Sequence, residues 1–134
     1  MRVVVDTGIL SASLSHRRRA QYRSHVARLT GQQVFLAAVT VSELRYGALV
    51  ADWGPSRRQQ LESALQTITV IPISDGLLTT IAELRFACRA AGHPLHEHSH
   101  ANDLWIAASA LHIGAPLLTV DNVFERAPGL TLLR

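Results

Sequence analysis

The sequence contains no lysine, and all thirteen of its basic side chains other than histidine are arginine. It has a single cysteine, Cys88, which excludes an internal disulfide and is typical of a protein in a reducing cytoplasm. No apolar run approaches the ~20 residues that a membrane-spanning helix needs. Because the first apolar segment reaches Asp6 at once, we expect no signal peptide, no membrane contact and a cytoplasmic location.

The missing lysine excludes several kinds of phosphate chemistry. There is no G-x-x-x-x-G-K-[ST] loop, and no G-x-G-x-x-G follows the first apolar segment. Receiver-type sites use a lysine, and haloacid dehalogenase-type sites use a D-x-D motif as well. The chain instead has Asp6–Thr7–Gly8 at the corresponding place, which excludes both kinds of site.

What the sequence does have is an excess of positive charge. Thirteen arginines against ten acids give a formal net charge of +3 with histidine neutral. The planar guanidinium group suits phosphate, so such a surface could attract a nucleic acid. The cluster Arg17–Arg18–Arg19, in the segment 15–29, is either a solvated helix face or an RNA-backbone contact. Codon bias explains the use of arginine equally well, so the charge alone is weak support for an RNA partner.

Apolar segments alternate with helical patterns along the whole chain. The expected strands cover residues 2–5, 33–38, 68–73, 117–120 and 130–133. Helices are expected to begin near residue 9, to cover 44–50 and 56–66, to run from a cap at 74–75 to Gly92, and to run from 103 to 111. With 134 residues, 48% of them hydrophobic, the chain can bury one core. The alternation predicts a single α/β domain over residues 1–134, with a mainly parallel sheet flanked by helices.

Four acids stand where these elements begin or end. Asp6 and Asp121 directly follow expected strands, whereas Glu43 and Asp103 open expected helices. In a parallel sheet, such positions meet at the carboxyl edge, where ligands bind. Each acid also has a structural explanation, because Asp6 fits a helix cap and Glu43 fits a capping box with Thr40. No such explanation covers all four acids at one edge, so we interpret them as a metal-binding nuclease centre.

The chemistry of a carboxylate cluster follows from its repulsion. Carboxylates packed within several ångströms of each other are tolerated only with shared protons or a cation. Mg²⁺ and Mn²⁺ prefer oxygen ligands, and one or two such ions can activate water and stabilise the leaving oxygen of a phosphodiester. We therefore predict hydrolysis without a covalent protein intermediate and without a lysine or histidine base.

Four histidines follow the long helix, at His93, His96, His98 and His100. Histidines two residues apart in an extended loop lie on one side of it and could bind zinc or nickel. An exposed polar loop is the simpler interpretation of the same segment, and a contact of one histidine to substrate or to a partner is a further alternative. The spacing alone leaves these alternatives open.

The helical segments over residues 40–66 are expected to form a hairpin beside the sheet. Its apolar positions outnumber those that one small core can cover, and they are Leu44, Tyr46, Leu49, Trp53, Leu61 and Leu65. We predict that some of them bind a segment of a partner protein or a second subunit. The alternative is ordinary burial against the sheet.

The motifs, taken in order, resemble those of PIN-domain ribonucleases, and specifically of VapC toxins from bacterial type II toxin–antitoxin pairs. The similarity runs from residue 3 to residue 133. It rests on Asp6–Thr7 after the first strand, Ser42–Glu43–Leu44 opening a helix, Asn102–Asp103–Leu104–Trp105–Ile106–Ala107–Ala108, and Thr119–Val120–Asp121 with Phe124. Each short motif is weak by itself, but the order and spacing are specific.

The resemblance implies a PIN-like three-layer sandwich and a Mg²⁺- or Mn²⁺-dependent endoribonuclease of the bacterial cytoplasm. It also implies inhibition by a VapB-like antitoxin and frequent formation of homodimers. The implied site consists of three core metal-binding acids, a fourth acid and two hydroxyl residues: Asp6, Glu43, Asp103, Asp121, Thr7 and Thr119. Gly8 stands where the family often has Ser or Asn, so that secondary hydrogen bond is missing. The alternative function is a PIN-like RNA-binding or interaction domain that does not cleave, although such domains tend to lose acids.

Overall fold

A parallel sheet forms the centre of the computed structural model, which describes residues 1–14 and 22–133. In the described chain its strands are β1 (Arg2–Val5), β2 (Gln33–Ala37), β3 (Thr69–Ile71) and β4 (Leu117–Leu118), in the order β3-β2-β1-β4. All three strand pairs are parallel, and β1 pairs with both β2 and β4. The predicted parallel sheet is therefore confirmed, with β3 at one edge and β4 at the other.

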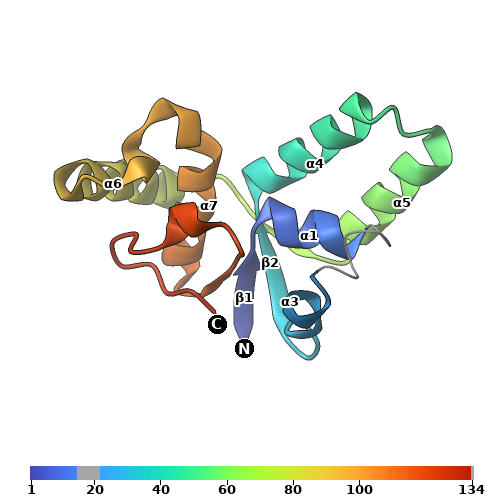
Figure 1. The fold of residues 1–134 in the computed structure, drawn as a ribbon, viewed down its shortest axis with the longest axis horizontal. Coiled ribbons are helices and arrows are strands. Elements are labelled where there is room, and N and C mark those ends of the chain that lie inside the picture. The colour runs from blue at the N-terminus through green and yellow to red at the C-terminus, as the bar shows by residue number, and fades with distance from the viewer. Residues whose placement is uncertain (15–21, 134) are drawn as a thin grey trace.

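Helices cover both faces of the sheet, which gives the three layers expected (Figure 1). On one side lie α6 (Asp75–Ala91) and α7 (Ala101–Ile113), joined by the short helices η1 (Pro94–His96) and η2 (His98–His100). On the other side lie α1 (Thr7–Ser13), α3 (Arg23–Ala27), α4 (Ala38–Val50) and α5 (Pro55–Gln66). A further turn, η3 (Asn122–Phe124), follows β4. Over the described ranges, no helix is long and apolar enough to cross a membrane.

The strand β1 organises the core because its side chains are buried on both faces. Val3, Val4 and Val5 are each 0% exposed. Successive residues of a strand face opposite sides, so Val4 packs with the α6–α7 layer while Val3 and Val5 pack with the other helices. This two-sided burial is why the strand is an uninterrupted apolar run.

Helix ends agree with the sequence at several places. The Ser74 hydroxyl accepts a hydrogen bond from the Leu77 backbone N–H at 3.1 Å and caps α6 as expected. Gly92 ends α6 and Gly114 ends α7, both in the left-handed region, with φ of 69° and 65°. These ends set where the connection from α6 to α7 begins and where α7 turns back toward β4.

The expected start of α4 is wrong. This helix begins at Ala38, directly after β2, and its N-cap Ala37 has no side-chain cap. Thr40 and Glu43 therefore do not form a capping box, and Glu43 lies beyond the first turn. The reason is tertiary, because Thr40 is 0% exposed and sits inside the helix, where it packs in the core and cannot act as a cap.

The last expected strand is also wrong. Residues 130–133 contribute only an isolated bridge between Leu117 and Leu132. Because β4 itself has two residues, it offers too short an edge for a regular ladder. The other strands after β1 are shorter than expected but in place. The segment 15–21, with its arginine cluster, lies outside the described residues, so the choice there between a solvated helix face and an RNA contact is not tested.

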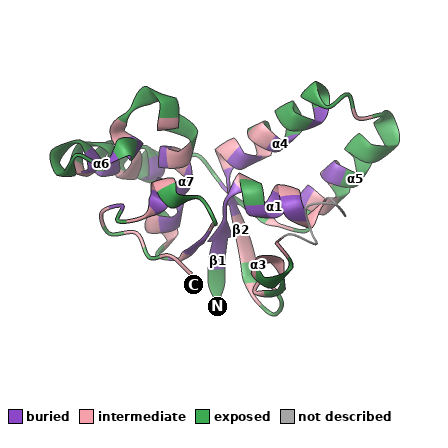
Figure 2. Ribbon diagram, viewed as in Figure 1, coloured by how far each residue is buried: buried purple, intermediate pink, exposed green. Residues whose placement is uncertain are grey.

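The helices α4 and α5 form the expected hairpin, which stands away from the sheet (Figure 1). Its base is buried through Leu44, Leu61 and Leu65. Its outer face is not, because Tyr46 is 69% exposed and Leu49 is 63% exposed (Figure 2). Burial against the sheet thus accounts for part of the apolar set and leaves an exposed face on α4.

Candidate metal centre

The first of the predicted site residues, Asp6, lies at the carboxyl end of β1 and is 6% exposed. Its Oδ1 accepts a hydrogen bond from the Ile9 backbone N–H at 3.0 Å, so Asp6 is the N-cap of α1. Its Oδ2 accepts a hydrogen bond from the hydroxyl of Thr119, which follows β4. Each carboxylate oxygen keeps acceptor capacity for another ligand, so the cap does not exclude metal binding.

Glu43 reaches this edge from α4. The Thr7 hydroxyl donates to its Oε1 at 2.7 Å, and the same hydroxyl lies 3.3 Å from the Thr40 hydroxyl oxygen. Thr7 is the residue after Asp6, so this bond ties Glu43 to the end of β1. The polar contact also explains why a threonine at position 40 is tolerated in the core, since its hydroxyl has a partner.

Asp103 and Asp121 complete the edge. Asp103 is in the first turn of α7, and its Oδ2 lies 3.3 Å from Nδ1 of His100. Asp121 follows β4, and its backbone N–H donates to the Thr119 hydroxyl oxygen at 3.0 Å. Its Oδ1 accepts from the Val123 N–H at 2.9 Å, so Asp121 also caps η3. Thr119 therefore connects the acid after β1 to the acid after β4.

The pKa of Asp6 shows that the acids share one electrostatic site. Burial is the largest cause that raises this pKa above its ordinary value of 3.8. The hydrogen bonds from Thr119 and Ile9 oppose the rise, whereas the charges of Asp121 and Asp103 add to it. Two acids from other elements thus act on the buried carboxylate.

Asp103 behaves in the same way. Burial is again the largest cause that raises its pKa, and the contact with His100 opposes it. The charges of Asp121 and Glu43 raise it further. Each of the four predicted acids therefore interacts with at least one other, so the structure brings the predicted set to one edge of the sheet.

The donor set fits a hard divalent cation. It consists of carboxylate oxygens with hydroxyl groups beside them and has no thiolate, which matches the preference of Mg²⁺ and Mn²⁺. In the conformations that the described side chains adopt, no three acids, histidines or cysteines converge closely enough to hold a metal. Without a cation, repulsion between the carboxylates keeps them apart, and a bound cation would allow them to approach more closely. The chemistry of the residues therefore fits the ion, and the assignment remains a proposal.

The histidine-rich segment forms two short helices, not an extended loop, and its four members do different things. The ring of buried His93 accepts from the Leu95 N–H at Nδ1 and donates from Nε2 to the Glu125 carbonyl oxygen at 2.8 Å. His93 is therefore a structural link between two loops. Within residues 93–100, all of which are described, no group of three side chains forms a zinc or nickel site.

His100 is the member of this segment that contacts a predicted metal ligand, and sequence reasoning did not single it out. The available signal was its spacing of three residues from Asp103, because residues three apart lie on the same face of a helix. The sequence left open a contact between one of these histidines and the substrate. His100 fits that alternative best, because it lies beside Asp103.

The fold and this edge define a PIN domain. A model of the PIN domain family matches residues 3–130, and the chain belongs to this family. It is 30% identical to Ribonuclease VapC5 of Mycobacterium tuberculosis over 128 residues, covering 94% of this chain and 87% of that protein. The predicted resemblance to VapC-type PIN-domain ribonucleases is confirmed, while the boundary of a single domain at 1–134 stays a prediction.

Solved structures have the same fold. The structure of VapBC2 from Rickettsia felis bound to a promoter DNA fragment is similar, with a TM-score of 0.81 and 23% identity over 99% of this chain and 98% of that chain. A toxin–antitoxin complex from Klebsiella pneumoniae is 27% identical, with a TM-score of 0.69 and coverage of 96% and 95%. The agreement spans nearly the whole of each chain, so it includes every element that carries a predicted acid.

The raised pKa values make a prediction about stability in the absence of metal. Because the pKa of Asp103 is higher in the folded protein, the folded state binds this proton more tightly than the unfolded state does. Its contribution to stability is thus present below the ordinary value of 3.8 and is lost as pH rises through the raised pKa. We expect Asp103→Asn to raise the melting temperature in EDTA at pH 7, and the gain to vanish below about pH 3.8.

Thermal melts of both proteins across this pH range test the prediction. Asp75→Asn is the matched control, because Asp75 is an exposed acid in the first turn of α6. It should not raise the melting temperature. A lower melting temperature for Asp103→Asn at pH 7 would show that this acid stabilises the metal-free fold, contrary to the electrostatic argument.

Proposed function

We propose that the chain is a Mg²⁺- or Mn²⁺-dependent endoribonuclease that hydrolyses RNA phosphodiester bonds as the toxin of a VapBC-type pair. The observation that carries this proposal is the placement of Asp6, Glu43, Asp103 and Asp121 at the carboxyl edge of the sheet, where Thr7 and Thr119 donate hydrogen bonds to Glu43 and Asp6. The relative named Ribonuclease VapC5 supports the activity, and the toxin–antitoxin complexes among the solved structures support the biological role.

The mechanism assigns the metal to the four acids. A bound Mg²⁺ or Mn²⁺ would activate water and stabilise the negative charge that develops on the phosphate and the leaving oxygen. Thr7 orients Glu43 through their hydrogen bond at 2.7 Å, and Thr119 orients Asp6. In the hydrolysis, a water oxygen bonds to phosphorus, the ester P–O bond breaks, and a proton goes to the leaving oxygen. No side chain becomes covalently attached to the RNA.

An antitoxin segment has a suitable place beside the acids. A groove of about 480 Å³ between α1, α4 and α5 begins at Thr7 and Glu43 and reaches Trp53 and Arg57. The Arg57 guanidinium carbon lies 3.9 Å from the Trp53 ring centroid at its far end. A VapB-like chain that lies in this groove would contact Glu43 and block access to the site. Inhibition by the antitoxin would follow from this overlap.

The exposed face of α4 supports a homodimer. Tyr46, Leu49 and Val50 are each more than 60% exposed, and together they form an apolar patch on the hairpin. Residues at this spacing lie on one face of a helix, and apolar side chains that are exposed together on one face favour an interaction surface. A second copy of the chain would cover the patch and leave the groove beside Glu43 accessible to the antitoxin.

The metal and the acids are tested together by cleavage of a labelled RNA. We expect cleavage with Mg²⁺ or Mn²⁺, none after thorough EDTA treatment, and a loss of about 100-fold or more for Asp103→Asn and Glu43→Gln, because each removes a charge from the metal site. Asp75→Asn should cleave as the parent does. A folded parent that binds RNA and leaves it intact with every divalent ion would instead identify the non-cleaving alternative.

The homodimer is tested by light scattering after gel filtration. We expect the parent to have twice the chain mass of 14.6 kDa, and Leu49→Asp to have the mass of one chain, because a buried carboxylate in an apolar interface is costly. Ile73→Asp is the control, since Ile73 is also exposed, at 58%, but lies outside α4. A parent that stays monomeric, or a Leu49→Asp variant that stays dimeric, would show that this patch is not the interface.

A further inference from the structure

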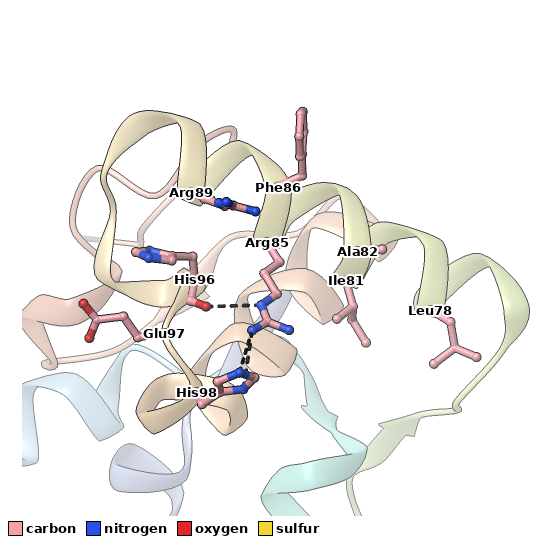
Figure 3. A pocket seen from close by; sticks show the side chains of 9 residues that line it. All are labelled: Leu78, Ile81, Ala82, Arg85, Phe86, Arg89, His96, Glu97 and His98. Atoms are coloured by element: carbon pink, nitrogen blue, oxygen red, sulfur yellow. Dashed lines mark hydrogen bonds between the residues drawn. The ribbon is translucent and has the colours of Figure 1, made fainter.

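A second groove lies between α6 and the two short helices that follow it, η1 and η2 (Figure 3). Its volume is about 940 Å³. Its polar and aromatic lining consists of two arginines, an exposed phenylalanine, two histidines and one acid: Arg85, Arg89, Phe86, His96, His98 and Glu97. Three apolar side chains, Leu78, Ile81 and Ala82, line the rest of it. Neither the cleavage chemistry nor the antitoxin groove uses any of them.

We propose that this groove binds the single-stranded RNA that flanks the cleaved bond, an inference that rests on the proposed function. The groove would hold one or two phosphates through its arginines and a base against Phe86. It would thereby extend the substrate contact from the acids onto α6. The groove would recognise RNA as a flexible polyanion with exposed bases. It would therefore increase the affinity for longer RNA, and it would take no part in the cleavage step.

The first argument is charge. Arg85 is held in place, because its Nε donates to the His96 carbonyl oxygen at 3.1 Å and its Nη2 lies 3.3 Å from Nε2 of His98 (Figure 3). Arg89 has no hydrogen bond or ion pair with any described residue. Glu97 is the one acid that lines the groove, so positive groups outnumber negative ones. Arginine binds phosphate oxygens with two parallel hydrogen bonds, which suits such a lining.

The second argument is the aromatic side chain. Phe86 is 76% exposed, and it projects from α6 away from the protein (Figure 3). It is adjacent to Arg85 in sequence and lies three residues before Arg89, on a neighbouring part of the helix surface. Proteins bind single-stranded RNA by stacking unpaired bases on aromatic rings while basic side chains follow the backbone. An exposed phenylalanine on the same helix as two arginines, next to Arg89 on the helix surface, has the composition that this mode requires.

The third argument is continuity with the acids. η2 runs directly into α7, and both of its ends make relevant contacts. At one end the His98 ring touches Arg85, and at the other His100 touches Asp103. A strand held at Asp103 would pass over this short turn to reach the groove. The groove is thus an extension of the candidate active site and not a remote patch.

The same features disfavour a protein partner in the groove. A helix from an antitoxin or from a second copy would have to cover Arg89, and burying an unpaired charge is costly. RNA instead supplies the counter-charge with each nucleotide. The charge of the groove therefore favours RNA over either protein. The test below distinguishes RNA from an antitoxin and from a second copy of the chain.

The test measures RNA affinity separately from cleavage. Fluorescence anisotropy in EDTA follows the binding of a labelled, unstructured RNA of about 12 nucleotides, a typical length for a single-strand site, and of a much shorter one. Arg89→Gln should weaken binding of the longer RNA about tenfold and reduce the salt slope of log K by about 0.7, as the loss of one phosphate contact predicts. Phe86→Ser should weaken it about tenfold with the salt slope unchanged. The shorter RNA should bind all proteins alike.

The matched control is Arg58→Gln, which removes the same charge from the exposed surface of α5. If Arg89→Gln and Phe86→Ser bind the longer RNA as this control does, the proposal is wrong. The proposal is also wrong if Phe86→Ser binds RNA normally but becomes a monomer in light scattering, because the groove would then bind a second copy of the chain. It is equally wrong if this variant binds RNA normally but no longer binds the antitoxin. A parent that cleaves RNA while the groove variants bind normally would overturn the groove alone. Variants that lose affinity while the parent never cleaves would support the groove and overturn the nuclease.

Discussion

Repulsion among carboxylates is the constraint on which this structure depends. Asp6 is buried at the end of the central strand, and the charges of two acids from other elements, Asp103 and Asp121, act on it. Burial and neighbouring charges raise the pKa of Asp6 and of Asp103. The ionised carboxylates therefore destabilise the folded state when no cation is bound. The rest of the sheet makes this possible, because β1 is fixed by burial on both faces and by pairing with β2 and β4.

Two threonines organise the acids, and no arginine in the described part of the chain forms an ion pair with any of the four. Thr7 connects α1 to Glu43, and Thr119 connects Asp6 to the backbone of Asp121. Among the described basic side chains, His100 is the one that contacts any of the four acids. The hydroxyls orient the carboxylates without neutralising them, so the negative charge stays available. A cluster of carboxylates of this kind favours a divalent cation, and the proposed function assigns such an ion to it.

The sequence predicted the parts of the fold that depend on local patterns. The valine run of β1 indicated a doubly buried strand, the glycines after α6 and α7 marked the ends of these helices, and four acids at element ends predicted a shared edge. Tertiary contacts overrode the local signal elsewhere: Thr40 and Glu43 match a capping box, yet burial of Thr40 places both inside α4. The role of His93 was unpredictable for a similar reason, since its partner Glu125 is 32 residues away.

The central claim is that the four acids bind a divalent metal. Anomalous diffraction from crystals soaked in Mn²⁺ tests it most directly, because the ion is located without reference to activity. The account predicts one or two Mn²⁺ peaks within about 2.5 Å of carboxylate oxygens, drawn from Asp6, Glu43, Asp103 and Asp121. It also predicts that the peak is lost in crystals of Asp103→Asn. A protein that cleaves RNA with Mn²⁺ but shows no manganese at these carboxylates would contradict the account.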